Sequence, residues 1–340
     1  MRDGNKQGAS RRTVLRAGAA VGSAAALGAA GAVVASGTAR AATPASSARR
    51  GLPYPAGVTD TSHCTQQVAE IFQGFYTAKS EHNAKQLMSY FSRANAYYID
   101  ASSGGIWPSW DALNNFFTPY FASGLPADAI SYPLRVVGDA RSAMVEFEDA
   151  PAFFGHELRI LGSVTFDSDH KIIRWIDYWD GRSSLTQNTI GSTYPTDFRD
   201  SEQRAGAGVV KVAAALQAAF AAGDAAAAVA LMSFDVVHED MAAHTRVRGQ
   251  LQVQRYYARA LGQLPYGTGA SLVHVEGSGQ GGGYEWKAAP VASPMRRGHT
   301  CVELDQSGKI SRLTAVYDSS LLSYPAYQSL VAQAAEAPLS

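Results

Sequence analysis

Two aspartates in apolar surroundings are the residues of this 340-residue chain best suited to proton transfer. Asp177 lies in residues 173–180, where strand alternation would place it on one face with Trp175 and Trp179. A carboxyl between two indole rings is partly removed from water, which raises its pKa and suits it to general acid–base catalysis. The alternative is a structural carboxylate that backbone donors or Arg159 satisfy.

Asp100 is the second candidate, because it ends a short predicted strand just before a glycine-containing turn. Tyr98 would share its face of that strand. Trp107 and Trp110 follow closely and are expected to line an aromatic substrate pocket. In the alternative interpretation, the Asp100 side chain only caps the turn.

A second group of polar residues lies about 140 positions further along the chain. His238 and Asp240 share a predicted strand face, and such a pair suits general acid–base work or the activation of water. His299 and Tyr317, on later predicted strands, are expected to contact a substrate. The histidine spacings are not those of a metal site, and no nucleotide fingerprint occurs, so we predict neither metal nor cofactor.

The elements that would position these residues occur in two copies along the sequence. At a shift of 139, residues 146–151 match 285–290, and at a shift of 138, residues 171–174 match 309–312. In each copy, helical periodicity gives way to alternating segments. In the first copy the segments are 132–139, 142–150, 157–167 and 171–180. This pattern predicts a tandem duplication of the α+β class, each copy with three helices on a curved, mixed, mostly antiparallel sheet.

The N-terminus has the pattern of a bacterial export signal. Arg11 and Arg12 precede a weakly apolar Ala- and Gly-rich stretch, and residues 39–41 offer a cleavage site. The paired arginines resemble the twin-arginine signal, so we expect a secreted protein. An uncleaved membrane anchor is the alternative, but a span favours Leu, Ile, Val and Phe. The predicted organisation is signal peptide 1–41, leader 42–60, first domain 61–190, linker 191–206, second domain 207–330 and tail 331–340.

Charge and cysteine content exclude several classes of protein. Lys and Arg total 29 and Asp and Glu total 29, and loss of the signal peptide would leave a mildly acidic chain. Nucleic acids and anionic membranes attract basic surfaces, so neither is an expected partner. Cys64 and Cys301 either form a disulfide between the domains or lie apart as buried thiols.

The order of elements resembles the nuclear-transport-factor-2-like superfamily of cone-shaped α+β domains. The superfamily includes ketosteroid isomerase, scytalone dehydratase, limonene epoxide hydrolase and the SnoaL-like polyketide cyclases. The resemblance is best over residues 216–232 and the following strand 236–240, which correspond to 75–91 and 97–100 in the first copy. It implies two cones that pack as an internal pseudo-dimer.

The resemblance also implies roles for individual residues. In SnoaL-like cyclases the catalytic acid/base lies on a late strand, where this chain has Asp177, and in ketosteroid isomerase the base lies ahead of a glycine turn, as Asp100 does. Phe75 would take the place of that isomerase's oxyanion-binding tyrosine, with Tyr76 about 100° away on the helix.

Together these features favour a secreted, cofactor-independent enzyme that moves protons on a small hydrophobic metabolite. Isomerisation, cyclisation, dehydration or epoxide opening of a polyketide- or terpenoid-like molecule would all use buried carboxyls and a hydrogen-bond donor. The alternative is a non-catalytic protein that captures such a metabolite in the same aromatic pocket.

Overall fold

The computed structural model describes residues 52–183, 198, 200–290 and 296–335. From Pro53 onward the chain forms one compact unit, in which we call residues 53–183 the first half and residues 200–335 the second half. The predicted signal peptide lies outside the described residues. In the part of the chain that is described, no helix is both long and apolar enough to cross a membrane.

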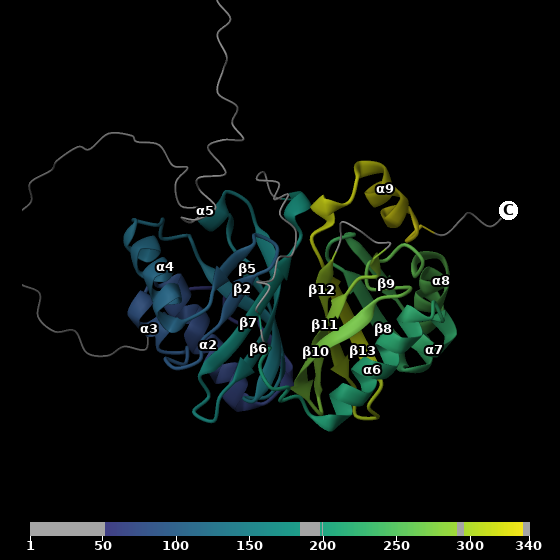
Figure 1. Cartoon of the computed structure of the whole chain (residues 1–340), viewed down its shortest axis with the longest axis horizontal. Coiled ribbons are helices and arrows are strands. Elements are labelled where there is room, and N and C mark those ends of the chain that lie inside the picture. The colour runs from purple at the N-terminus through teal and green to yellow at the C-terminus, as the bar shows by residue number, and fades with distance from the viewer. Residues whose placement is uncertain (1–51, 184–197, 199, 291–295, 336–340) are drawn as a thin grey trace, which may run out of the picture. The chain divides into compact units, whose positions relative to one another are not determined.

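The first half is a seven-stranded mixed sheet with helices against one face (Figure 1). Its strand order is β1-β4-β5-β6-β7-β2-β3, in which β1 pairs with β4 and β2 pairs with β7 in parallel and the other pairs are antiparallel. The elements are β1 (Asp60–Cys64), α2 (Gln66–Ser80), α3 (Ala84–Met88), β2 (Tyr98–Asp100), β3 (Gly105–Trp107), α4 (Trp110–Ala122), β4 (Ser131–Gly138), β5 (Ser142–Asp149), α5 (Pro151–Phe154), β6 (Leu158–Phe166), β7 (Ile172–Trp179) and a 3₁₀ helix (Gly181–Ser183).

The second half is a six-stranded sheet in the order β10-β11-β12-β13-β8-β9. This is the order of β4-β5-β6-β7-β2-β3 in the first half, and the pair β13–β8 is parallel as β7–β2 is. The elements are α6 (Ala207–Ala221), α7 (Ala225–Ala230), β8 (Met232–Asp240), β9 (Thr245–Arg248), α8 (Gln250–Ala260), β10 (Ser271–Ser278), β11 (Gly281–Lys287), β12 (Arg297–Leu304), β13 (Ile310–Val316), a 3₁₀ helix (Ser319–Leu321) and α9 (Tyr324–Ala332).

The α+β class with mixed sheets is confirmed, and the four strand segments predicted for the first copy lie within about a residue of β4 to β7. Ser109 caps α4, as its sequence position indicates, by accepting a hydrogen bond from the Ala112 amide at 3.1 Å. The helix number was wrong: the described residues form eight α-helices rather than six. Neither α5 nor α9 was expected. The first is one turn that begins at Pro151, too short to show a helical period, and the second lies at the predicted end of the domain.

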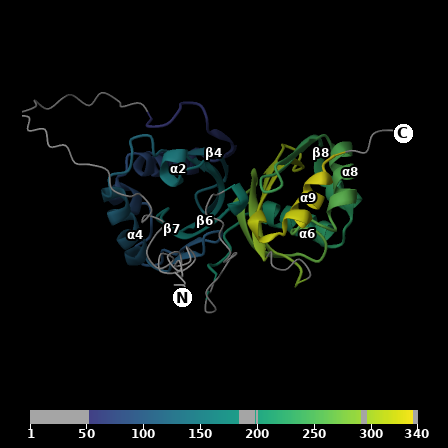
Figure 2. The same ribbon diagram turned by 90° about the horizontal axis from the view of Figure 1, so that it is seen from above.

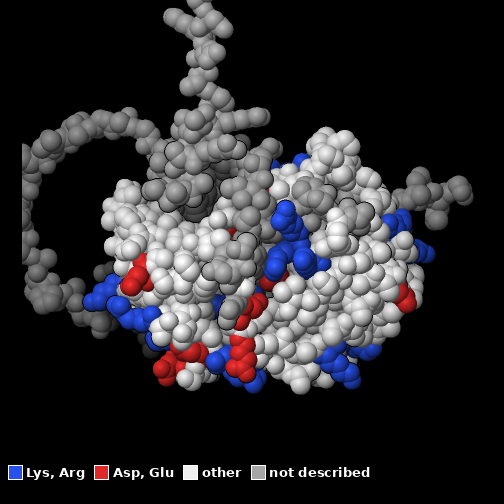
Figure 3. Space-filling view, viewed as in Figure 1, with Lys and Arg blue, Asp and Glu red and all other residues white. Residues whose placement is uncertain are grey.

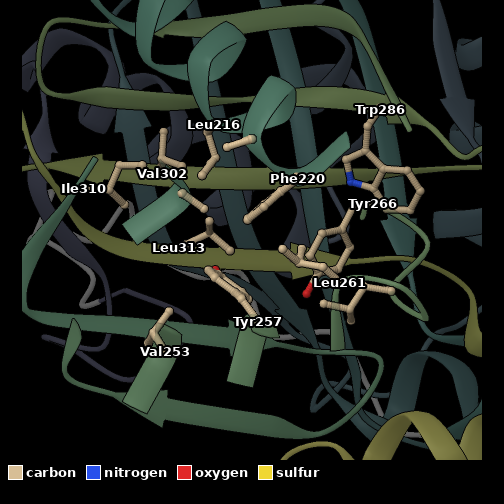
Figure 4. Packing of buried hydrophobic residues seen from close by; sticks show 14 of the residues in the cluster. Leu216, Phe220, Val253, Tyr257, Leu261, Tyr266, Trp286, Val302, Ile310 and Leu313 are labelled. Carbon is tan, nitrogen blue, oxygen red and sulfur yellow. The ribbon is translucent and has the colours of Figure 1, made fainter. Parts of the chain in front are cut away.

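Each sheet has one face packed against its own helices. In the first half, Phe72, Phe75 and Tyr76 of α2 pack against Phe147 and Trp175 of the sheet. Figure 4 shows the equivalent core of the second half, where side chains of α6 and α8 meet those of the sheet. The labelled residues are Leu216, Phe220, Val253, Tyr257, Leu261, Tyr266, Trp286, Val302, Ile310 and Leu313.

The opposite faces of the two sheets pack against each other, so that the helices of both halves lie on the outside (Figures 1 and 2). Ile176 and Tyr178 of β7 share one buried cluster with Cys301 of β12 and Val316 of β13. Cys64 belongs to a different cluster, in the interior of the first half. Both cysteines are therefore buried free thiols, and the disulfide alternative does not apply.

Charged side chains on the face shown in Figure 3 lie in small groups separated by uncharged surface. Between the two sheets, arginines of the first half meet buried carboxylates of the second half.

Candidate active site

The Asp177 carboxyl lies inside the first half, with the whole residue only 3% exposed. The pairing of β7 with β2 sets Tyr98 beside Trp175, and Tyr98 donates its phenolic hydrogen to Asp177 Oδ2. The indole N–H of Trp175 donates to the other oxygen, Oδ1. Gly162 faces Asp177 on β6, and a Cβ there would lie 2.7 Å from Oδ1, so this strand position has room for the carboxyl because it is glycine.

Burial raises the pKa of Asp177 to about 7, and the nearby Asp100 charge acts in the same direction. The hydrogen bonds from Tyr98 and Trp175 oppose this shift because they stabilise the ionised form. The opposing effects leave a carboxyl that both releases and takes up a proton near neutral pH, as general acid–base catalysis requires.

Asp100 is held by two donors of different kinds. The Trp179 indole N–H donates to its Oδ1 at 2.9 Å, and so does the Ser103 amide, also at 2.9 Å. The second bond is the turn cap that the alternative interpretation expected. Burial raises the pKa of Asp100 above its usual value. Asp100 therefore caps the turn and, through its charge, also raises the pKa of Asp177.

A row of half-buried aromatic rings leads away from the carboxyl. The Tyr98 ring centroid lies 5.3 Å from that of Trp107, which lies 4.7 Å from that of Phe116. Phe75 packs beneath Trp175 at 4.8 Å. These rings provide an apolar, polarisable surface of the kind that binds flat hydrophobic molecules.

Trp110 is not part of this row. Its indole N–H donates to the Met88 carbonyl at 3.0 Å, and the Arg93 guanidinium lies 3.8 Å from the centre of its ring. The structure therefore places Trp110 in the contact between α3 and α4.

Tyr76 is a residue that the sequence interpretation left out of the site. It was expected to point away from Phe75, yet both side chains are buried in the interior. The Tyr76 hydroxyl has no hydrogen-bond partner among the described residues. Burial, and then the Asp177 charge, raise its pKa well above the usual value. The sequence did indicate that Tyr76 points inward, because it follows Phe72 by four residues and residues four apart lie on one helix face.

In the second half, Asp240 has a comparable environment built from other residues. The Tyr266 hydroxyl donates to its Oδ2 at 3.0 Å and the Ala243 amide to its Oδ1 at 2.8 Å. Burial raises the pKa of Asp240 to about 7. His238 is fully buried with its Nδ1 3.0 Å from the Tyr257 hydroxyl, and burial lowers its pKa to about 3. This histidine is therefore neutral at physiological pH.

The structure brings Tyr317 to the Asp240 cluster but not His299. The Asp240 charge adds to burial in raising the pKa of Tyr317. His299 lies on the opposite face of the sheet, where its Nδ1 is 3.1 Å from the Leu161 carbonyl of the first half. Within the described residues, no group of three or more His, Cys, Asp or Glu side chains is arranged to hold a metal ion.

Comparisons with known proteins give similarity to parts of the chain. No family model and no curated protein matches the sequence. An uncharacterised protein with a cystatin-like fold from Silicibacter pomeroyi DSS-3 is 17% identical, with a TM-score of 0.31, and the match covers 38% of this chain and 85% of that one. A putative SnoaL-like polyketide cyclase from Shewanella denitrificans OS-217 is 12% identical, with a TM-score of 0.29, and the match covers 35% of this chain and 94% of that one. A steroid delta-isomerase from Pseudomonas aeruginosa is 16% identical, with a TM-score of 0.31, and the match covers 39% of this chain and 92% of that one. The chemistry of this chain has to be derived from its own residues.

The raised pKa of Asp240 predicts a pH-dependent stability. Between its ordinary value of 3.8 and about 7 the folded state holds a proton that the unfolded chain has released, so stability falls as the pH rises through this range. Asp240→Asn removes this contribution, and we expect the fall to become shallower by on the order of 1 kcal/mol per pH unit. Urea unfolding from pH 4 to pH 8 measures it. Equal slopes for parent and variant would refute the assignment, and the exposed Asp169→Asn serves as the control.

Proposed function

We propose that the first half is a cofactor-independent enzyme that moves a proton on a small hydrophobic molecule, with Asp177 as the acid/base. The observation that carries this proposal is the buried Asp177 carboxyl, which has a pKa of about 7 and lies between two hydrogen-bond donors beside a row of aromatic rings. A group that titrates near neutral pH is the kind that general acid–base catalysis uses.

The geometry supports a simple proton transfer. The ionised Asp177 takes a proton from the carbon next to a substrate carbonyl, and the electron pair of the broken C–H bond moves onto the carbonyl oxygen. The buried Tyr76 hydroxyl donates a hydrogen bond to that oxygen. Return of the proton to a different atom of the substrate completes an isomerisation, and addition of the carbanion to a second carbonyl gives a cyclisation. Tyr98 orients Asp177 throughout.

The surroundings favour a largely apolar substrate, such as a polyketide- or terpenoid-like molecule. The rings of Tyr98, Trp107 and Phe116 offer contact area and few charges. Because Asp177 is almost fully covered, a substrate reaches it only after one of the half-buried rings moves aside.

A ligand screen tests the proposal. Thermal-shift measurements with polyketides, terpenoids, steroids and epoxides identify binders, and product analysis shows which are converted. Conversion by the parent, with binding but no conversion by Asp177→Asn, supports the enzyme, and Asp100→Asn, which removes a nearby charge, is run beside it. A ligand bound unchanged by all three proteins would favour the capture protein instead.

We also propose that the chain is a tandem duplication whose two cone-shaped copies pack as an internal pseudo-dimer. A reciprocal contact supports this: the Asp180 carboxylate of the first half accepts from the Ser319 amide at 2.8 Å, and Asp318 of the second half accepts from the Gly181 amide at 3.0 Å. Asp180 and Asp318 are 138 residues apart, the shift of the sequence repeat.

Finally, we propose that the chain is exported in the folded state through its paired arginines. Replacement of both Arg11 and Arg12 by lysine is expected to leave the uncleaved chain inside a bacterial host, because the pathway recognises the arginine pair. Cell fractionation measures this, with Arg16→Lys as the matched control. Equal export of the double variant and the control would contradict the proposal.

A further inference from the structure

An ion pair lies inside the first half, between α2 and the sheet. Lys79 belongs to the last turn of α2 and Asp149 is the last residue of β5, and Lys79 Nζ lies 2.6 Å from Asp149 Oδ1. The two side chains are only 14% and 6% exposed. The ammonium group also lies 5.0 Å and 5.5 Å from the ring centres of Phe147 and Phe153. The cation is therefore held in place by a carboxylate and two aromatic rings.

The ion pair and Asp177 adjoin the same group of aromatic side chains. Tyr76 and Lys79 are three residues apart on α2, so they lie on one face of that helix. The Phe147 ring, beside Lys79, has its centroid 5.2 Å from that of Tyr76 and 6.3 Å from that of Trp175. Trp175 in turn donates to Asp177. Charges act strongly on one another in such surroundings, because water does not screen them.

The charges of the ion pair act on the groups of the proposed active site. Burial raises the pKa of Asp177 and the Asp100 charge adds to this, whereas the Lys79 charge lowers it. Burial also raises the pKa of Tyr76, to which the charges of Asp177 and Asp149 contribute. Further titratable groups face this region from the packed elements, namely Tyr54, His82, Tyr98 and Tyr120.

The second half has apolar residues at the positions that correspond to the ion pair and to the acid/base. The repeat aligns Lys79 with Phe220 at a shift of 141, Asp149 with Ala288 at a shift of 139 and Asp177 with Ala315 at a shift of 138. All three apolar residues belong to the core of the second half, where Figure 4 shows Phe220. This fold therefore packs without the ion pair, and a buried ion pair adds little stability over apolar packing. Its presence beside Asp177 alone points to a role in the chemistry.

We propose that Lys79 and Asp149 are positioning residues of the active site, which set how readily Asp177 ionises. The Lys79 cation favours the carboxylate form of Asp177, and Asp149 limits this effect by neutralising most of that charge. The pair thus balances the two protonation states that an acid/base alternates between. The inference rests on the proposed function, because it concerns the same acid/base.

The indole N–H of Trp175 reports the ionisation of Asp177 without any substrate, because it donates to Asp177 Oδ1. In a ¹⁵N-labelled full-length chain its signal is assigned by loss in Trp175→Phe and followed from pH 5 to pH 9. The parent signal is expected to move with a midpoint at about pH 7, and Asp177→Asn is expected to abolish this movement. The indole N–H of Trp179 donates to Asp100 and reports that neighbour separately.

Two variants are expected to move the midpoint in opposite directions. Lys79→Met removes the cation and is expected to raise the midpoint by about 0.5–1 pH unit, whereas Asp149→Asn uncovers the cation and is expected to lower it by a similar amount. The double variant, which removes both charges, is expected to lie between the two. The matched control is Lys85→Met, which removes an exposed lysine of the same half and is expected to leave the midpoint unchanged.

The outcomes separate this inference from the proposed function. Parent midpoints in both single variants, or shifts of both in one direction, would overturn the role of the ion pair and leave Asp177 as the acid/base. A parent signal without a midpoint would overturn the proposed acid/base and the inference together. If Lys79→Met does not fold, Asp149→Asn must still lower the midpoint and the double variant must raise it again.

Discussion

Replacement of Asp177 by asparagine is expected to lower the turnover of the converted substrate by about 10²- to 10⁴-fold, the usual contribution of a positioned acid or base. Asparagine has nearly the same shape and keeps an oxygen that accepts from Trp175 or Tyr98, so the interior remains packed. It cannot exchange a proton near neutral pH. We therefore expect kcat to fall while KM changes little, because substrate binding depends mainly on the aromatic rings.

Two comparisons separate a catalytic effect from a structural one. Asp318→Asn changes another buried carboxyl with a raised pKa, but at the contact between the halves, and is expected to retain activity. In the parent, activity is expected to rise with pH through about 7, since Asp177 must be ionised to take a proton. A wild-type turnover in Asp177→Asn, or an equal loss in Asp318→Asn, would remove Asp177 from the proposed mechanism.

The alternation of residues along the strand correctly grouped Asp177 with its tryptophan neighbours but did not identify its hydrogen-bond partner Tyr98. The shared face of Asp177, Trp175 and Trp179 follows from the two-residue period of a strand. The hydrogen bond from Tyr98 depends on the parallel pairing of β2 with β7, residues almost 80 positions apart, and no local pattern encodes that pairing. The sequence interpretation therefore grouped Tyr98 with Asp100 alone.

The prediction for the second site was wrong about His299 because this residue lies on a strand that is buried on both faces. Every residue from Gly298 to Leu304 of β12 is buried, so alternation does not reveal which face is the interior of the half. His299 was grouped with Tyr317, whereas the structure places it against Leu161 between the sheets. Arg159 is similar: it was considered a partner for Asp177, but it pairs with Glu146 and with Glu239 of the second half.

Arg174 is the buried arginine at the centre of the contact between the two sheets. Its guanidinium donates to Asp200 at 2.6 Å and lies 3.4 Å from both Glu276 and Glu285 of the second half. The side chain is only 1% exposed. His274 also contacts Asp200 and Glu276. Burial and the Arg174 charge lower its pKa, but the hydrogen bonds to Asp200 and Glu276 and the Glu276 charge outweigh them and raise it to about 9. Removal of the arginine would leave the buried carboxylates of Glu276 and Glu285 without this cation.

Arg174→Met is therefore expected to lower the free energy of unfolding by about 3–5 kcal/mol, the usual cost of breaking a buried ion pair from one side. Urea unfolding at pH 7 measures the loss. Arg141→Met removes an arginine whose side chain is 61% exposed and paired with Asp139, and is expected to cost no more than about 1 kcal/mol. If the two variants lose equal stability, the charges between the sheets do not hold the halves together, and the apolar contacts of Ile176, Tyr178 and Val316 must do so alone.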